Sequence, residues 1–222
     1  MLRSAPWFLL LSCFAWSGLV AAAAETFGLE GDRAALAARS PDEWVRQAQL
    51  LEKRRDWPGL LTWGEAWAQV DAKNPLPWFI RGRALGEMGR YAEAIAAYGH
   101  NVRIAPRDVW ARNNLGNAYR DSGRPRDAMR AYRAAVEIDP EYIQAWHNLG
   151  LTFYLSKGQA GVTQALKKLQ ATDPALADLW RTLAIEYSIT RDPRVAREAV
   201  KVLRGLSAAE RARMFRILFD EA

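Results

Sequence analysis

Histidine and cysteine, two residue types that often carry catalysis or bind metals, are rare in this chain. The 222 residues include two histidines, His100 and His147, and one cysteine, Cys13. The sequence contains no H-E-x-x-H zinc motif, no glycine-rich phosphate loop and no G-x-S-x-G nucleophile motif. Aspartate and glutamate are plentiful, but carboxylates on helix surfaces are usually solvated. We therefore predict that the protein is not an enzyme, and we expect neither a metal site nor another cofactor.

The first 24 residues have the composition of a secretory signal peptide. Arg3 supplies a positive charge, the run from Trp7 to Val20 is mainly apolar, and Ala22-Ala23-Ala24 offers small residues for cleavage before Glu25. Cleavage would remove Cys13 and leave an exported, periplasmic protein without a membrane span. Two alternatives remain open, an uncleaved leader that anchors the chain in the membrane and lipid attachment at Cys13.

Basic residues outnumber acidic ones. The 31 Lys and Arg against 25 Asp and Glu give a formal net charge of +6. Such an excess can attract nucleic acid or anionic lipid. Here the basic residues are spread over the chain and mixed with acidic ones, so we interpret them as a solvated surface. We expect no nucleic-acid partner.

The most regular pattern in the chain begins at Val109 and ends at Pro140. It matches the spacing W-x2-L-G-x2-Y…A-x3-F…P, in which the period is about 34 residues. Steps of that period place a small residue at the position of Gly116 in every unit. The residues that carry the pattern are Leu115, Gly116, Tyr119, Ala128, Tyr132, Ala135 and Pro140, and the small residues of the other units are Ala48, Gly82, Gly150 and Ala184.

This pattern resembles the tetratricopeptide repeat (TPR) family. The resemblance implies an all-α fold, an α-solenoid of five TPR helix hairpins with a C-terminal capping helix. The domains that it implies are a signal peptide (1–24), a lead-in segment (25–40), five units (41–74, 75–108, 109–142, 143–176 and 177–210) and a capping helix (207–222).

Local signals refine the ends of these helices. Ser40 with Glu43, and Ser207 with Glu210, have the spacing of capping boxes, which predicts that helices begin there. Gly89 favours a turn between the two helices of the second unit, and Gly123 favours the corresponding turn in the third unit. The segment 157–161 contains two glycines, so we expect a looser or shortened second helix in the fourth unit.

In TPR proteins the first helix of each unit lines the concave face of the array. The resemblance therefore implies that this face contacts a partner protein or peptide. The groove-facing places of the family select the candidate residues Phe79, Arg83, Trp110, Asn113, Asn114, Asn117, Arg120, His147, Asn148 and Arg181.

Asn114 and Asn148 occupy the same place in successive units. This arrangement resembles the asparagine ladder of O-linked N-acetylglucosamine transferases, which holds an extended peptide by its backbone. An asparagine amide both donates and accepts hydrogen bonds. Two roles remain open for these residues, contact with peptide backbone and bonding from helix to helix.

Trp110 and Phe79 are aromatic residues at groove-facing places, and Arg83, Arg120 and Arg181 occupy other groove-facing places. Aromatic and arginine side chains often dominate the binding energy of interfaces. The alternative is that Trp110 packs against the neighbouring unit.

The carboxylate clamp of co-chaperone TPR domains is incomplete in this chain. Asn117 and Asn148 match its asparagine places, but Asn113 stands where the clamp has a lysine, and Asp178 occupies a later basic place.

We predict a non-enzymatic protein–protein interaction scaffold of the bacterial cell envelope. It would bind a partner protein or an extended peptide in the concave TPR groove. The alternative is a structural protein that self-associates through its tryptophan-rich first unit and leaves the groove unused, which would make it a homo-oligomer.

Overall fold

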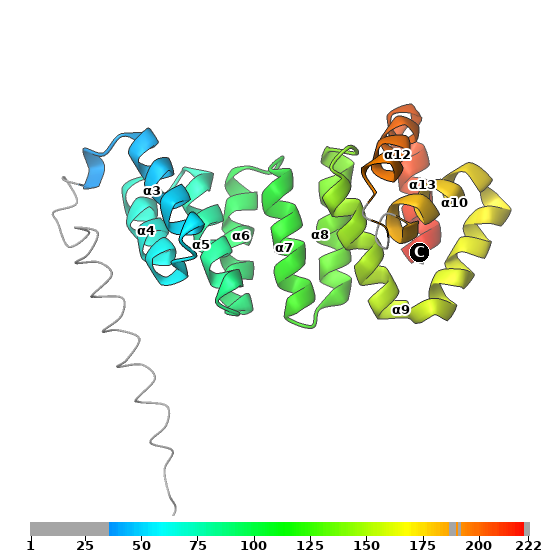
Figure 1. Ribbon diagram of the computed structural model, residues 1–222, viewed down its shortest axis with the longest axis horizontal. Coiled ribbons are helices and arrows are strands. Elements are labelled where there is room, and N and C mark those ends of the chain that lie inside the picture. Colours follow the sequence, from blue (N-terminus) through cyan, green and yellow to red (C-terminus); the bar gives the residue numbers. More distant parts are fainter. Residues whose placement is uncertain (1–35, 187–189, 191, 220–222) are drawn as a thin grey trace, which may run out of the picture. The chain divides into compact units, whose positions relative to one another are not determined.

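The computed structural model describes residues 36–186, 190 and 192–219. The regular secondary structure of these residues is helical throughout, so the predicted all-α fold is confirmed (Figure 1). The predicted signal peptide (1–24) and most of the lead-in segment (25–40) lie outside the described residues. The chain divides into two compact units between Ile104 and Ala105. These two larger parts are called the first unit and the second unit below, and each contains more than one of the 34-residue TPR units.

The first unit consists of α3 (Pro41–Lys53), α4 (Trp57–Val70), α5 (Pro75–Glu87) and α6 (Tyr91–Ile104), each packed against the next. The capping box predicted for α3 is confirmed, because Ser40 N–H donates to the Glu43 carboxylate at 2.7 Å and Glu43 N–H donates to Ser40 Oγ.

Three tryptophans form the core of the first two helices. The rings of Trp63 and Trp67 lie 4.5 and 5.6 Å from the Trp44 ring, and Trp63 Nε1 donates to the Trp44 carbonyl at 2.9 Å. All three side chains are buried. These tryptophans therefore stabilise their own unit and do not form a surface for a second copy.

The second unit begins with a hairpin of α7 (Val109–Asp121) and α8 (Pro125–Ile138). Gly123 reverses the chain between them with a φ of 76°, as the turn prediction requires. The helices approach closely at Gly116, where an added Cβ would lie 2.5 Å from Tyr132 Cε1. The first unit repeats this contact between Gly82 and Tyr98, at 2.8 Å. The small residue predicted at this place thus makes room for the ring of its own hairpin.

The next helix, α9 (Ile143–Thr172), bends at Gly158, whose φ of 65° and ψ of 178° are not helical. The bend divides α9 into a first arm (143–157) and a second arm (159–172). The second arm reaches Thr172, so the expected shortening of this helix is wrong. The glycine instead changes the direction of the chain, because its left-handed φ is accessible at little cost only without a Cβ.

The remaining helices are α10 (Pro174–Trp180), the π-helix η1 (Arg181–Glu186), α12 (Pro193–Gly205) and α13 (Ala208–Phe219). Figure 1 shows α10 and α13 in the angle between the two arms of α9. Phe153 of the first arm meets Trp180 of α10 edge to face, with ring centroids 5.9 Å apart. The two arms of α9 are therefore held apart by later parts of the chain.

The C-terminal helix α13 packs against both arms. Phe215 stacks on Trp146 of the first arm at 5.5 Å, and Arg133 of α8 lies 5.3 Å from the Phe215 ring. Arg213 donates to the Thr172 carbonyl at the end of the second arm. Met214, Phe215 and Leu218 are buried. The predicted capping box of this helix is also confirmed between Ser207 and Glu210.

Replacing Gly116 by alanine should lower the free energy of unfolding by about 1–3 kcal/mol, because the new methyl group would overlap the Tyr132 ring. Gly99 is the matched control. It lies inside α6 with no atom within 4 Å of an added Cβ, so Gly99→Ala should stabilise the protein by about 1 kcal/mol through helix propensity alone. Urea unfolding followed by circular dichroism measures both, and equal changes would contradict the packing at Gly116.

Removing the Phe215 ring should lower the free energy of unfolding by about 3–5 kcal/mol, the usual cost of truncating a buried phenylalanine. Thermal unfolding of Phe215→Ala measures this change. Val202→Ala on α12 is the control, since Val202 is 46% exposed and should matter little. A Phe215→Ala protein that is as stable as the control would show that α13 does not hold the arms of α9.

Candidate partner-binding surface

The second unit brings five predicted residues onto one surface. Asn113 and Asn114 precede Asn117 by four and three residues on α7, and Arg120 follows Asn117 by three, so these side chains lie near that of Asn117. Asn148 reaches Asn113 and Asn117 from the first arm of α9. We call these five residues the polar wall. Asn114, Asn117, Arg120 and Asn148 are half-buried, whereas Asn113 is only 5% exposed.

Asn117 Oδ1 is the centre of the hydrogen bonds behind this wall. It accepts hydrogen bonds from the Tyr132 hydroxyl at 2.7 Å and from Asn148 Nδ2 at 3.3 Å. Arg120 Nη1 donates a longer hydrogen bond to the same oxygen, at 3.5 Å. Asn148 Nδ2 also donates to Asn113 Oδ1 at 2.9 Å. One oxygen thus joins α7, α8 and α9, and the bonding from helix to helix that we considered for Asn148 is present.

The polar wall still has atoms that can bind a partner. Asn148 Oδ1 and Asn114 Nδ2 form no hydrogen bond with any described residue, because the bonds of these side chains use Asn148 Nδ2 and Asn114 Oδ1. One is an acceptor and the other a donor, the two groups that pair with a peptide unit. The two roles considered for Asn148 are therefore compatible.

The hydroxyl of Tyr132 is a part of this site that we did not predict. The TPR pattern identifies Tyr132 only as a packing residue. Burial raises the pKa of Tyr132, so its hydroxyl remains a protonated donor to Asn117. A tyrosine where the family pattern has phenylalanine was the signal in the sequence that could have indicated this bond.

Trp110 lies at the start of α7 and is 64% exposed. Its ring is nearly parallel to that of Tyr142, with an interplanar angle of 13° and centroids 6.5 Å apart. Tyr142 was also missed by the sequence analysis. It precedes α9 at the place where Ser40, Asn74 and Asp108 cap other helices, but its side chain forms no capping hydrogen bond. An aromatic residue at a capping place was the available signal.

Two predicted residues belong to the first unit. Phe79 meets Tyr98 edge to face at 5.8 Å. Arg83 forms ion pairs with Glu52 at 3.3 Å and with Glu87 at 3.5 Å. The charge of Arg83 is therefore already balanced inside this unit.

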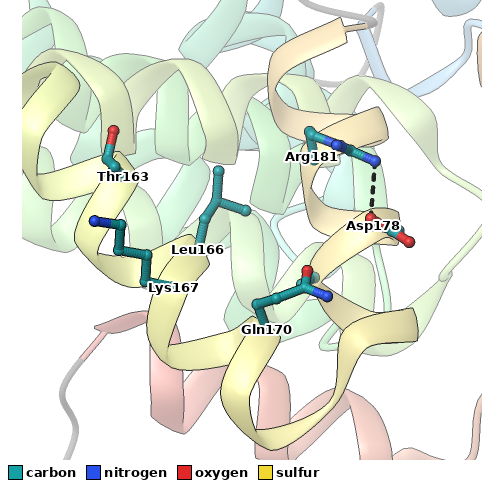
Figure 2. Close-up of a pocket in the computed structure, with 7 residues that line it drawn as sticks. Thr163, Leu166, Lys167, Gln170, Asp178 and Arg181 are labelled. Atoms are coloured by element: carbon teal, nitrogen blue, oxygen red, sulfur yellow. Dashed lines mark hydrogen bonds and ion pairs between the residues drawn. The ribbon is translucent and has the colours of Figure 1, made fainter.

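The last two predicted residues, His147 and Arg181, do not belong to the polar wall. His147 is 5% exposed, so its side chain lies beneath the surface of the first arm. Arg181 is exposed and donates to Asp178 at 2.8 Å (Figure 2). Arg181 and Asp178 lie beside an open pocket between the second arm of α9 on one side and α10 with the start of η1 on the other (Figure 2). The volume of this pocket is about 230 Å³. The pocket is lined by Thr163, Leu166, Lys167, Gln170, Ala177, Asp178 and Arg181.

Among residues 36–186, 190 and 192–219, no three His, Cys, Asp or Glu side chains gather closely enough to hold a metal ion. Within the same ranges, we find no helix whose length and hydropathy would let it span a bilayer.

Tyr132→Phe should lower the free energy of unfolding by about 1 kcal/mol, because it removes the hydroxyl that bonds to Asn117 and keeps the ring that fills the space at Gly116. Tyr154→Phe is the control, since Tyr154 is 46% exposed and should change stability by less than about 0.5 kcal/mol. Urea unfolding compares the two variants. An equal decrease in the free energy of unfolding of both variants would mean that the hydrogen bond from Tyr132 to Asn117 does not stabilise the fold.

Comparison with known proteins supports the repeat assignment. Residues 82–123 and 116–156 match a family model of the TPR repeat. The fold is similar to a crystal structure of MamA, with 15% identity, 92% of this chain and 100% of that chain covered, and a TM-score of 0.54. It is also similar to MamA 41-end from Desulfovibrio magneticus RS-1, with 20% identity, 82% and 97% covered, and a TM-score of 0.51.

At these identities the likeness to solved structures concerns the fold alone. No curated protein matches the sequence. The repeat match and the fold agree with the pattern of small and aromatic residues in the sequence. Residues 82–156 contain tetratricopeptide repeats, and the fold is an all-α solenoid.

Proposed function

We propose that this protein is a non-enzymatic scaffold that binds an extended segment of a partner protein on the polar wall of its second unit. The observation that carries this proposal is the pair of unused amide atoms, Asn148 Oδ1 and Asn114 Nδ2, on adjacent first helices. A peptide backbone offers one donor and one acceptor per residue. The wall can therefore hold a chain by its backbone with little dependence on its side chains.

The network behind the wall prepares it for binding. Asn148 Nδ2 is held by two acceptors, Asn113 and Asn117, and this fixes the direction in which Asn148 Oδ1 points. Binding then costs less side-chain entropy than it would for freely rotating amides. Trp110 supplies exposed aromatic area beside the wall, and aromatic residues contribute strongly to interfaces.

The cellular place that we propose is the bacterial envelope, with the mature protein in the periplasm. This part of the proposal depends on the signal-like composition of residues 1–24. Anchoring by an uncleaved leader is the alternative.

Self-association through the first TPR unit (41–74) is the weaker candidate function. Trp44, Trp63 and Trp67 would have supplied its apolar surface, but these side chains are 1–3% exposed. Trp110, in the second unit, is 64% exposed. The apolar surface that is available for a partner thus favours the second unit.

Trp110→Ala and Asn148→Ala should each reduce the amount of partner captured from a periplasmic extract by tenfold or more, the effect of losing about 1.4 kcal/mol or more of binding energy. The control is Arg126→Ala, an exposed substitution on α8. Quantitative mass spectrometry compares the captured proteins. Circular dichroism must first show that each variant is folded, because Asn148 also joins helices.

A photo-crosslinking residue at Gln144, an exposed position four residues before Asn148, tests the same proposal directly. It should crosslink to a short continuous segment of the captured partner, and the same group at Arg126 should not. Capture that is unchanged in both alanine variants, with crosslinks that favour position 126, would exclude the polar wall as the binding surface.

A further inference from the structure

A partly exposed aromatic stack and two carboxylates lie at the ends of helices in the second unit. Trp110 and Tyr142 form the stack, with nearly parallel rings. Asp108 stands two residues before Trp110, and Asp139 stands three residues before Tyr142. We call these four residues the rim.

Backbone hydrogen bonds hold both carboxylates in place. Asp108 Oδ1 accepts from Ala111 N–H at 2.9 Å, and Asp139 Oδ1 accepts from Glu141 N–H at 2.9 Å. The Asp139 carbonyl also accepts from Tyr142 N–H at 3.2 Å. Burial first, and then the charges of Asp108 and Asp139, raise the pKa of Tyr142, which agrees with the carboxylates lying beside its ring.

Neither rim carboxylate has an ion-pair partner among the residues that the structure describes. Two neighbouring arginines are occupied elsewhere. Arg112 donates to the Pro106 carbonyl at 2.7 and 2.9 Å, and Arg204 forms a two-point ion pair with Glu141 at 2.6 and 2.9 Å. Neither carboxylate of the rim is therefore engaged in a salt bridge with these arginines, and both remain available to a cation from a partner.

We propose that the rim binds a basic side chain, arginine in preference to a neutral one, on the segment that occupies the polar wall. The inference rests on the proposed function in this respect alone, that rim and wall would contact the same segment. A guanidinium group stacks on the face of an exposed indole and is attracted by its electrons. Its planar array of donors also fits a carboxylate through two hydrogen bonds. The polar wall would hold the backbone, and the rim would select the side chain.

The probe for this site is N-acetyl-arginine methylamide, with its citrulline counterpart as the neutral compound of the same shape. The protein is labelled with 5-fluorotryptophan, and Trp110→Phe identifies the fluorine signal of Trp110. Titration should shift that signal with an apparent Kd about three- to fivefold lower for the arginine compound than for the citrulline compound, the ratio expected when a cation contacts both an exposed aromatic ring and exposed carboxylates.

The double variant Asp108→Asn/Asp139→Asn tests the role of charge. Asparagine keeps the side-chain oxygen that accepts the backbone hydrogen bonds, so the helix start at α7 is retained. This variant should bind the arginine compound more weakly than the wild type does, because the two negative charges are gone, while its Kd for the citrulline compound should stay the same. The part of the arginine preference that Trp110 supplies should remain. Equal binding of both compounds by the wild type, a larger shift with N-acetyl-glutamate methylamide, or no shift with any of the three would overturn the proposal.

The small probes separate this inference from the proposed function. If the wild type does not discriminate between arginine and citrulline while Asn148→Ala still loses the partner, the rim inference alone fails. If the arginine preference is found but the wall variants capture the partner normally, the proposed function alone fails.

Discussion

The close contact between Gly116 and Tyr132 is the constraint on which the second unit depends. The glycine leaves room for the ring, and the ring position brings the Tyr132 hydroxyl within 2.7 Å of Asn117. Asn117 then orients Asn148 on the neighbouring helix. A packing requirement between two helices of one hairpin thus determines how the amides of the candidate binding surface are presented.

Both units use this packing, but they support different surfaces with it. Gly82 and Tyr98 repeat the contact in the first unit. The residue after the glycine is Arg83 in the first unit and Asn117 in the second. Arg83 forms ion pairs with Glu52 and Glu87, whereas Asn117 forms an uncharged network. An amide keeps both donor and acceptor capacity, and this makes the second unit the better place for a peptide backbone.

The bend in α9 changes the role of the C-terminal helices. In the α7–α8 hairpin the second helix folds directly onto the first. At Gly158 the second arm of α9 turns away, and α13 brings Phe215 onto Trp146 of the first arm. Buried apolar contacts of this kind compensate for the separated arms. The first arm is therefore stabilised from the α8 side, while the polar wall that it shares with α7 keeps its unused amide atoms.

The sequence alone determined the repeat, its period, the all-α class and the starts of several helices, because these depend on local spacing and on capping residues such as Ser40 and Asp108. It also selected the amides of the polar wall. Only the tertiary structure decided which atoms of those amides are used between helices, because that depends on side chains from three helices. The exposed stack of Trp110 on Tyr142, the burial of His147 and the position of α13 were likewise decided by contacts between distant segments, which no spacing rule within one helix can specify.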